Sequence, residues 1–124
     1  MTVFQMKDIR FAQGDWELKI PELSLVKGEA LGIIGKNGAG KSTLLRVMSL
    51  LAKPQQGEIW FDGAKVGRNN LAVRRKMAVV LHEPLLISGP VIKNVGLALR
   101  FKGIASSQYQ TEVDYWLTYF ELNH

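Results

Sequence analysis

Cysteine is missing from this sequence of 124 residues. Disulfide bonds and thiolate metal sites are therefore excluded, and a reducing compartment fits best. Long apolar runs are also missing, because none approaches the roughly 20 residues that a helix needs to cross a bilayer. The opening residues, MTVFQMKDIR, lack the apolar core of a signal peptide. Any link to a membrane is thus expected to go through a partner.

Acidic residues are fewer than basic ones, with 11 Asp and Glu against 16 Lys and Arg. This surplus of positive charge fits an anionic ligand or an acidic partner. The most basic stretch, residues 65–76, has no interleaved aromatic side chains and is interpreted as a solvated face. Direct binding of nucleic acid is therefore not expected. The length leaves room for one domain with a real core.

The first third of the chain has the period-two pattern of β-strands. Residues 2–11 and 16–20 alternate, Pro21 is expected to interrupt the pattern, and a turn is expected at residues 27–29. The segments 30–35 (ALGIIG) and 77–81 (MAVVL) are instead apolar throughout, which is typical of buried parallel strands.

The remaining segments predict helices and one hairpin. Helices are expected over residues 41–54, 91–101 and from about Ser107, with a short helical turn within 71–76. Ser107 and Gln110 have the spacing of a capping box. The apolar stripe of the last helix consists of Val113, Trp116, Leu117 and Phe120, and Asp62-Gly63 predicts the turn of the hairpin.

Residues 35–42, GKNGAGKS, match the phosphate-binding pattern G-x-x-x-x-G-K-[ST]. An apolar segment precedes the loop and an amphipathic one follows it, which is the context that this motif requires. Backbone N–H groups and the following helix N-terminus are expected to hold phosphate oxygens. The expected nucleotide-binding residues are Gly35, Lys36, Asn37, Gly38, Ala39, Gly40, Lys41, Ser42 and Thr43.

Three of these residues have separate expected roles. Lys41 should reach the β- and γ-phosphates, and the Ser42 hydroxyl is the expected Mg²⁺ ligand. Thr43 either donates to the α-phosphate or only supports the first turn of the helix.

Phosphoryl transfer also needs a second acid that organises Mg²⁺. Asp62 follows a short apolar run but is interpreted mainly as a turn residue. Glu83 follows the apolar segment 77–81 and is a weak candidate, and Glu121 is interpreted as a solvated residue of the last helix.

The loop GKNGAGKST, with Asn37 and Ala39 inside it, resembles the Walker A motif of ABC-type ATPases, and the resemblance covers nearly the whole chain. It implies an α/β fold: a P-loop NTPase (RecA-like) core with an antiparallel β subdomain and a helical subdomain. The implied divisions are residues 1–30, mainly the β subdomain, 31–90, the P-loop core with a β-hairpin, and 91–124, the start of the helical subdomain. ATP and Mg²⁺ are the implied ligands.

The resemblance also implies two functional positions outside the loop. Phe11 aligns with the aromatic residue that stacks on adenine, and Trp16 is the second candidate because the register between them is uncertain. His82 takes the place of the Q-loop glutamine, where it has either that role or only a structural one in the loop.

The family's signature sequence, Walker B aspartate, catalytic glutamate and switch histidine do not appear in the 124 residues. We therefore expect the N-terminal half of a nucleotide-binding domain, which binds ATP without hydrolysing it. The implied partners are a second nucleotide-binding subunit and a membrane-spanning permease at the cytoplasmic face of the membrane, with import of a small solute favoured over export. The alternatives are a small P-loop kinase, a soluble non-transport ATPase of the same family, a nucleic-acid binder, or a remnant that binds nothing.

Overall fold

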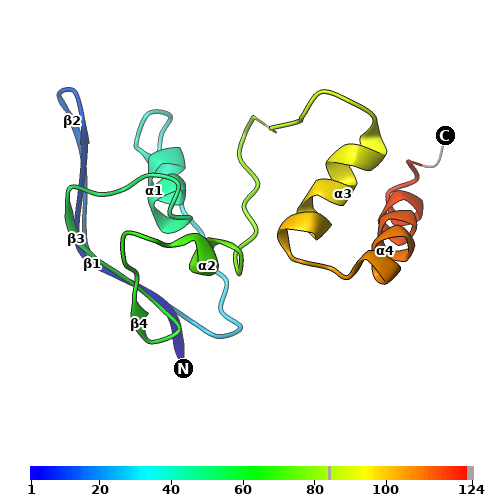
Figure 1. Ribbon diagram of the computed structural model, residues 1–124. Coiled ribbons are helices and arrows are strands. Elements are labelled where there is room, and N and C mark those ends of the chain that lie inside the picture. Colours follow the sequence, from blue (N-terminus) through cyan, green and yellow to red (C-terminus); the bar gives the residue numbers. More distant parts are fainter. Residues whose placement is uncertain (84, 123–124) are drawn as a thin grey trace. The chain divides into compact units, whose positions relative to one another are not determined.

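The computed structural model describes residues 1–83 and 85–122 of the chain (Figure 1). These residues form two compact units, of which the first spans Met1–Val79 and the second begins at Val80. Each unit is described by itself.

A four-stranded antiparallel sheet forms the frame of the first unit. Its strands are β1 (Thr2–Gln13), β2 (Trp16–Val26), β3 (Gln56–Phe61) and β4 (Ala64–Lys65), in the order β2-β1-β3-β4. β3 and β4 pair on either side of Asp62 and Gly63, so the hairpin predicted there is confirmed.

β2 runs through Pro21, and the interruption expected at this residue is wrong. The register pairs Lys7 with Glu22 and Ile9 with Ile20, which leaves Asp8 and Pro21 between two paired positions. Asp8 has a positive φ of 51°, so β1 is irregular at this point. A residue without a backbone N–H is tolerated there because the irregular position does not require its hydrogen bond.

Helix α1 (Lys41–Met48) supplies the other half of the core of the first unit. Leu44 and Val47, three residues apart, point to the sheet and pack with the buried residues of β1 and β3. The core residues are Phe4, Met6, Ile9, Leu44, Val47, Leu50 and Ile59. α1 ends before Ser49, earlier than the Pro54 boundary that the sequence predicts, because Leu50 adopts a positive φ of 60°.

The two parallel strands expected at residues 30–35 and 77–81 are wrong: no strand is assigned to either segment. Ile34 and Val80 are 97% and 90% exposed, respectively. A buried parallel strand needs strands on its flanks and helices over its faces. Within the described residues, all strand pairing is antiparallel and involves other segments, so these two apolar stretches have no ladder to join.

The helices are otherwise close to expectation. The short α2 (Leu71–Arg74) is confirmed, and α3 (Val91–Phe101) has the predicted bounds. α4 (Ser106–Tyr119) packs on α3 through Leu99, Val113 and Leu117. Trp116 and Phe120 of the predicted apolar stripe are 38% and 59% exposed, and Glu121 lies just beyond the helix.

The predicted capping box is wrong, because Ala105 precedes the helix and no side chain caps it. α4 starts one residue before Ser107, and the Ala105 carbonyl accepts the N–H groups of Gln108 and Tyr109. None of the helices in the described part of the chain is both long and apolar enough to cross a bilayer.

Candidate functional site

The glycine-rich loop leads directly into α1. Gly40 is the residue before the helix and has a φ of 94°, which a residue with a Cβ adopts only with strain. Lys41, Ser42 and Thr43 therefore form the first helical turn, whose N–H groups have no partner within the helix. These groups and the positive end of the helix dipole make this turn suitable for a phosphate group.

The Lys41 side chain folds back over the loop. Its Nζ atom donates to the carbonyl oxygens of Gly35 at 2.7 Å and Lys36 at 2.8 Å. The ammonium group is thus held where the loop begins, close to the backbone that would surround a phosphate. A lysine ammonium has three donors, so one N–H remains for a phosphate oxygen while both carbonyls stay bound.

A cavity of about 440 Å³ lies between this loop and the β1–β2 tip (residues 13–16). Its lining consists of Gln13, Trp16, Asn37, Gly38, Gly40, Lys41, Ser42 and Thr43. Six of the nine predicted loop residues thus face one cavity, and two others, Gly35 and Lys36, bind Lys41 through their carbonyls. The remaining one, Ala39, donates its N–H to the Lys36 carbonyl within the loop.

Of the two aromatic candidates for a base-stacking role, Trp16 lines this cavity and Phe11 is not part of the lining. Phe11 is partly buried and packs against the core cluster of the first unit. The Trp16 ring lies against Gly40 so closely that a Cβ added there would come within 2.5 Å of it. The structure therefore joins Trp16, rather than Phe11, to the loop.

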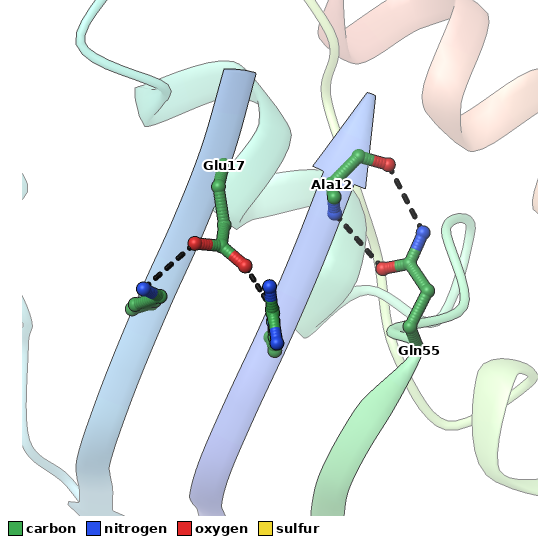
Figure 2. A network of polar contacts seen from close by, with 5 residues as sticks. Ala12, Glu17 and Gln55 are labelled. Carbon is green, nitrogen blue, oxygen red and sulfur yellow. Dashed lines mark hydrogen bonds and ion pairs between the residues drawn. The ribbon is translucent and has the colours of Figure 1, made fainter. Parts of the chain in front are cut away.

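The β1–β2 tip is held by hydrogen bonds from the residue just before β3. The Gln55 side chain binds both backbone polar groups of Ala12, accepting its N–H at 2.9 Å and donating to its carbonyl at 3.0 Å (Figure 2). On β2, Glu17 accepts from Lys19 at 2.8 Å and from Arg10. The Lys19 hydrogen bond, together with Arg10, holds the pKa of Glu17 below its usual value.

No carboxylate of the described residues lines the cavity. Asp62 lies in the hairpin turn with Lys76 at 3.4 Å. No group of three or more potential metal ligands of the His, Cys, Asp or Glu type occurs among residues 1–83 and 85–122. His82 and Glu83 belong to the second unit, so the predicted role of His82 stays a prediction.

Two residues near the cavity were missed from the sequence. The position of Gln13 could have been found from the hairpin, since it pairs with Trp16 across the turn. Gln55 carries no sequence signal, because its partner Ala12 is 43 residues away.

The chain was compared with protein families and with known proteins. A family model described as ABC transporter matches residues 18–124. The methionine import ATP-binding protein MetN of Legionella pneumophila (strain Paris) is 41% identical over 105 residues, which cover 81% of this chain and 31% of that protein.

Two solved structures share the fold. An ATP-binding subunit of an ABC transporter superimposes with a TM-score of 0.77 at 26% identity, over 98% of this chain and 51% of that one. The ATP-binding cassette MJ0796, in a dimeric state bound to ADP and Pi, superimposes with a TM-score of 0.73 at 26% identity, over 93% of this chain and 56% of that one.

The chain thus spans about a third of this curated relative and about half of these solved cassettes. The family match begins within β2, continues through the loop and α1, and includes both helices of the second unit. The fold class expected from the sequence is confirmed by the two cassettes, whose structures align with nearly the whole chain. The loop, the cavity and the fold are all consistent with these relatives. The chain therefore belongs to the ABC transporter family.

Proposed function

We propose that this chain is the nucleotide-binding part of an ABC transporter ATPase subunit, and that it binds ATP or ADP with Mg²⁺ through residues 35–43. The observation that carries this proposal is the single cavity shared by Lys41, Ser42 and Trp16. The loop and α1 supply a cation and helix N–H groups for phosphates, here called the phosphate end, and the β1–β2 tip supplies an aromatic face for a base, here called the nucleoside end.

Magnesium fits the same end of the cavity. The Ser42 hydroxyl lines it and has no hydrogen-bond partner in the described part of the chain. An oxygen ligand beside bound phosphates suits Mg²⁺, which keeps most of its water and takes few protein ligands. The ion would supply charge neutralisation at the phosphates, while Lys41 and the first turn of α1 orient them.

Binding without turnover is proposed for the 124 residues alone. In-line attack needs a positioned water and an acid that organises the metal ion. Among the described residues, those that line the cavity include neither a carboxylate nor a histidine. Hydrolysis in the assembled protein would then depend on groups contributed from outside this cavity.

The transport role rests on the relatives. MetN is named as a methionine import protein, and the MJ0796 cassette is described as a dimer. By that likeness, we propose that the chain pairs with a second nucleotide-binding subunit. It would also work with a membrane-spanning permease on the cytoplasmic face of the membrane and power import of a small solute.

Calorimetric titration with MgADP tests the nucleotide proposal. Wild type should bind, and Lys41→Ala should weaken binding at least about tenfold, because hydrogen bonds to charged groups contribute about 1.5–3 kcal/mol each. Lys27→Ala is the matched control: this exposed lysine lies outside residues 35–43, and its hydrogen bond to Met1 uses only the backbone N–H. Equal losses in both variants, or no binding by wild type, would contradict the proposal.

A further inference from the structure

Gln55 extends the sheet by means of its side chain. β3 begins at Gln56, which pairs with Arg10 of β1. One residue earlier, the Gln55 N–H donates to the Arg10 carbonyl at 2.9 Å, and its side-chain amide binds the N–H and carbonyl of Ala12. The amide thus continues the hydrogen-bonding ladder of β1 past the first residue of β3, as Figure 2 shows.

Without this amide, the end of the β1–β2 hairpin would be a two-stranded ribbon. β1 pairs with β2 as far as Gln13 and Trp16, whereas its pairing with β3 stops at Arg10. Two-stranded ribbons are only marginally stable in water. Gln55 therefore supplies the attachment of Ala12 on the side of β1 opposite β2.

The residues that follow this attachment line the cavity. Gln13 is next to Ala12 in the chain, and Trp16 is next to Glu17, the cross-strand partner of Ala12. The loop residues at the phosphate end lie instead at the start of α1 and do not contact Gln55 through any of its hydrogen bonds. The attachment therefore bears directly on the nucleoside end of the cavity and reaches the loop only through the Trp16 ring, which lies against Gly40.

We propose that Gln55 is a positioning residue for the nucleoside end of the cavity. By fixing Ala12 it holds the β1–β2 tip over the loop, so that Trp16 and Gln13 present a preformed surface to the base. Preformed sites bind more tightly because less ordering is required on binding. This inference rests on the proposed function, since it concerns how the same cavity holds a nucleotide.

A calorimetric comparison of two ligands separates positioning from general stabilisation. MgADP uses both ends of the cavity, whereas magnesium pyrophosphate uses only the phosphate end. Gln55→Ala should weaken MgADP binding about tenfold, which corresponds to one or two hydrogen bonds, and leave pyrophosphate binding within about twofold. Gln55→Glu keeps the acceptor for the Ala12 N–H but loses the donor to the Ala12 carbonyl. Its MgADP affinity should therefore lie between those of wild type and Gln55→Ala.

Gln5→Ala is the matched control. Gln5 also lies in the sheet and donates its side-chain amide, to Glu22 at 3.1 Å, but far along β1 from the tip. This variant should leave the affinities for both ligands unchanged.

Unchanged MgADP affinity in Gln55→Ala would overturn the inference. An equal loss of affinity for MgADP and for magnesium pyrophosphate in this variant would also overturn it. The same holds if wild type bound the two ligands with equal affinity. Failure of wild type to bind MgADP would instead overturn the proposed function, and the inference with it.

Discussion

Trp16 and Phe11 lie on the two strands of one hairpin, and their side chains have different surroundings. Phe11 and Leu18 form a cross-strand pair, and both pack against the core. Trp16 is instead the first residue of β2 after the turn and lies against Gly40. An aromatic ring in the core contributes to stability, and a ring on a cavity wall can stack on a base. The two roles can therefore be separated by substitution.

Trp16→Ala should weaken MgADP binding about tenfold or more, because stacking of a base on an aromatic side chain contributes about 1–3 kcal/mol. Phe11→Ala should instead lower the free energy of unfolding, by about 2 kcal/mol for a partly buried ring. Calorimetric titration and urea unfolding of both variants provide the two measurements. If Phe11→Ala lost the greater share of MgADP affinity without losing stability, Phe11 would be the stacking residue.

At the residue scale, the loop was predictable because its signal is local. The positions from Gly35 to Thr43 are consecutive, and their chemistry follows from glycines, a lysine and a hydroxyl at fixed spacing. The choice between Phe11 and Trp16 was not local. It depends on which side of the hairpin meets the core and which meets Gly40, and this requires the folded structure.

Glu17 links the two strands of the β1–β2 hairpin, because it accepts from Arg10 of β1 and from Lys19 of β2. Since Lys19 and Arg10 hold the pKa of Glu17 below its usual value, the folded state binds this proton less readily than the unfolded chain does. The stabilisation that the ionised Glu17 contributes is therefore fully present above the pKa of the unfolded chain, about 4.3. It is lost as the pH falls through the lower pKa of the folded state.

Urea unfolding from pH 7 to pH 3 should show this dependence. The difference in stability between wild type and Glu17→Gln should be constant down to about pH 5.5 and should shrink below about pH 4. Lys19→Met removes the largest cause of the shift, so the pH dependence should be weaker in this background. A difference that grows on acidification would contradict the assignment.

Gly57 is required where β3 crosses an irregular part of β1. The pairing of β1 with β3 shifts register between Lys7 and Arg10. Gly57 has a φ of 93°, and a Cβ on it would lie 2.5 Å from the Asp8 carbonyl oxygen. The clash is with backbone, which cannot move aside as a side chain would.

Gly57→Ala should therefore lower the free energy of unfolding by about 2 kcal/mol or more. Gly67→Ala is the matched control, because a Cβ there meets nothing within 4 Å. Its effect should stay within about 0.5 kcal/mol. Thermal or urea unfolding measures the stability of each variant. If Gly57→Ala were as stable as Gly67→Ala, β1 would have adapted to the added methyl group.

At the element scale, prediction succeeded where an element carries its own start and stop signals. α3 follows Pro90 and keeps its predicted bounds, and the β3–β4 turn falls on Asp62-Gly63. Prediction failed for the segments 30–35 and 77–81, whose apolar character indicates strands but not the strands with which they would pair. Strand formation is a property of the ladder, so composition alone could not decide it.

At the scale of the whole molecule, both units expose large apolar side chains. Ile34 and Val80 are almost fully exposed. Four exposed aromatic residues at the end of α4 contact one another, namely Tyr115, Trp116 and Tyr119 of the helix and Phe120 just beyond it. A contiguous apolar surface such as this aromatic group usually marks an interface. Segments with strand-forming composition and unpaired backbone groups also favour pairing with another chain.

The 124-residue chain should therefore self-associate, with an average mass in sedimentation equilibrium that rises with concentration. Replacing both Ile34 and Val80 by Lys should reduce this association, because burial of their apolar surface contributes about 25 cal/mol per Å². The double variant Gln56→Lys, Asn69→Lys adds the same charge at exposed polar positions and controls for electrostatic repulsion. If both double variants lowered the average mass equally, charge rather than apolar contact would govern the association. If wild type were monomeric at high concentration, these exposed side chains would not form an interface between copies of the chain.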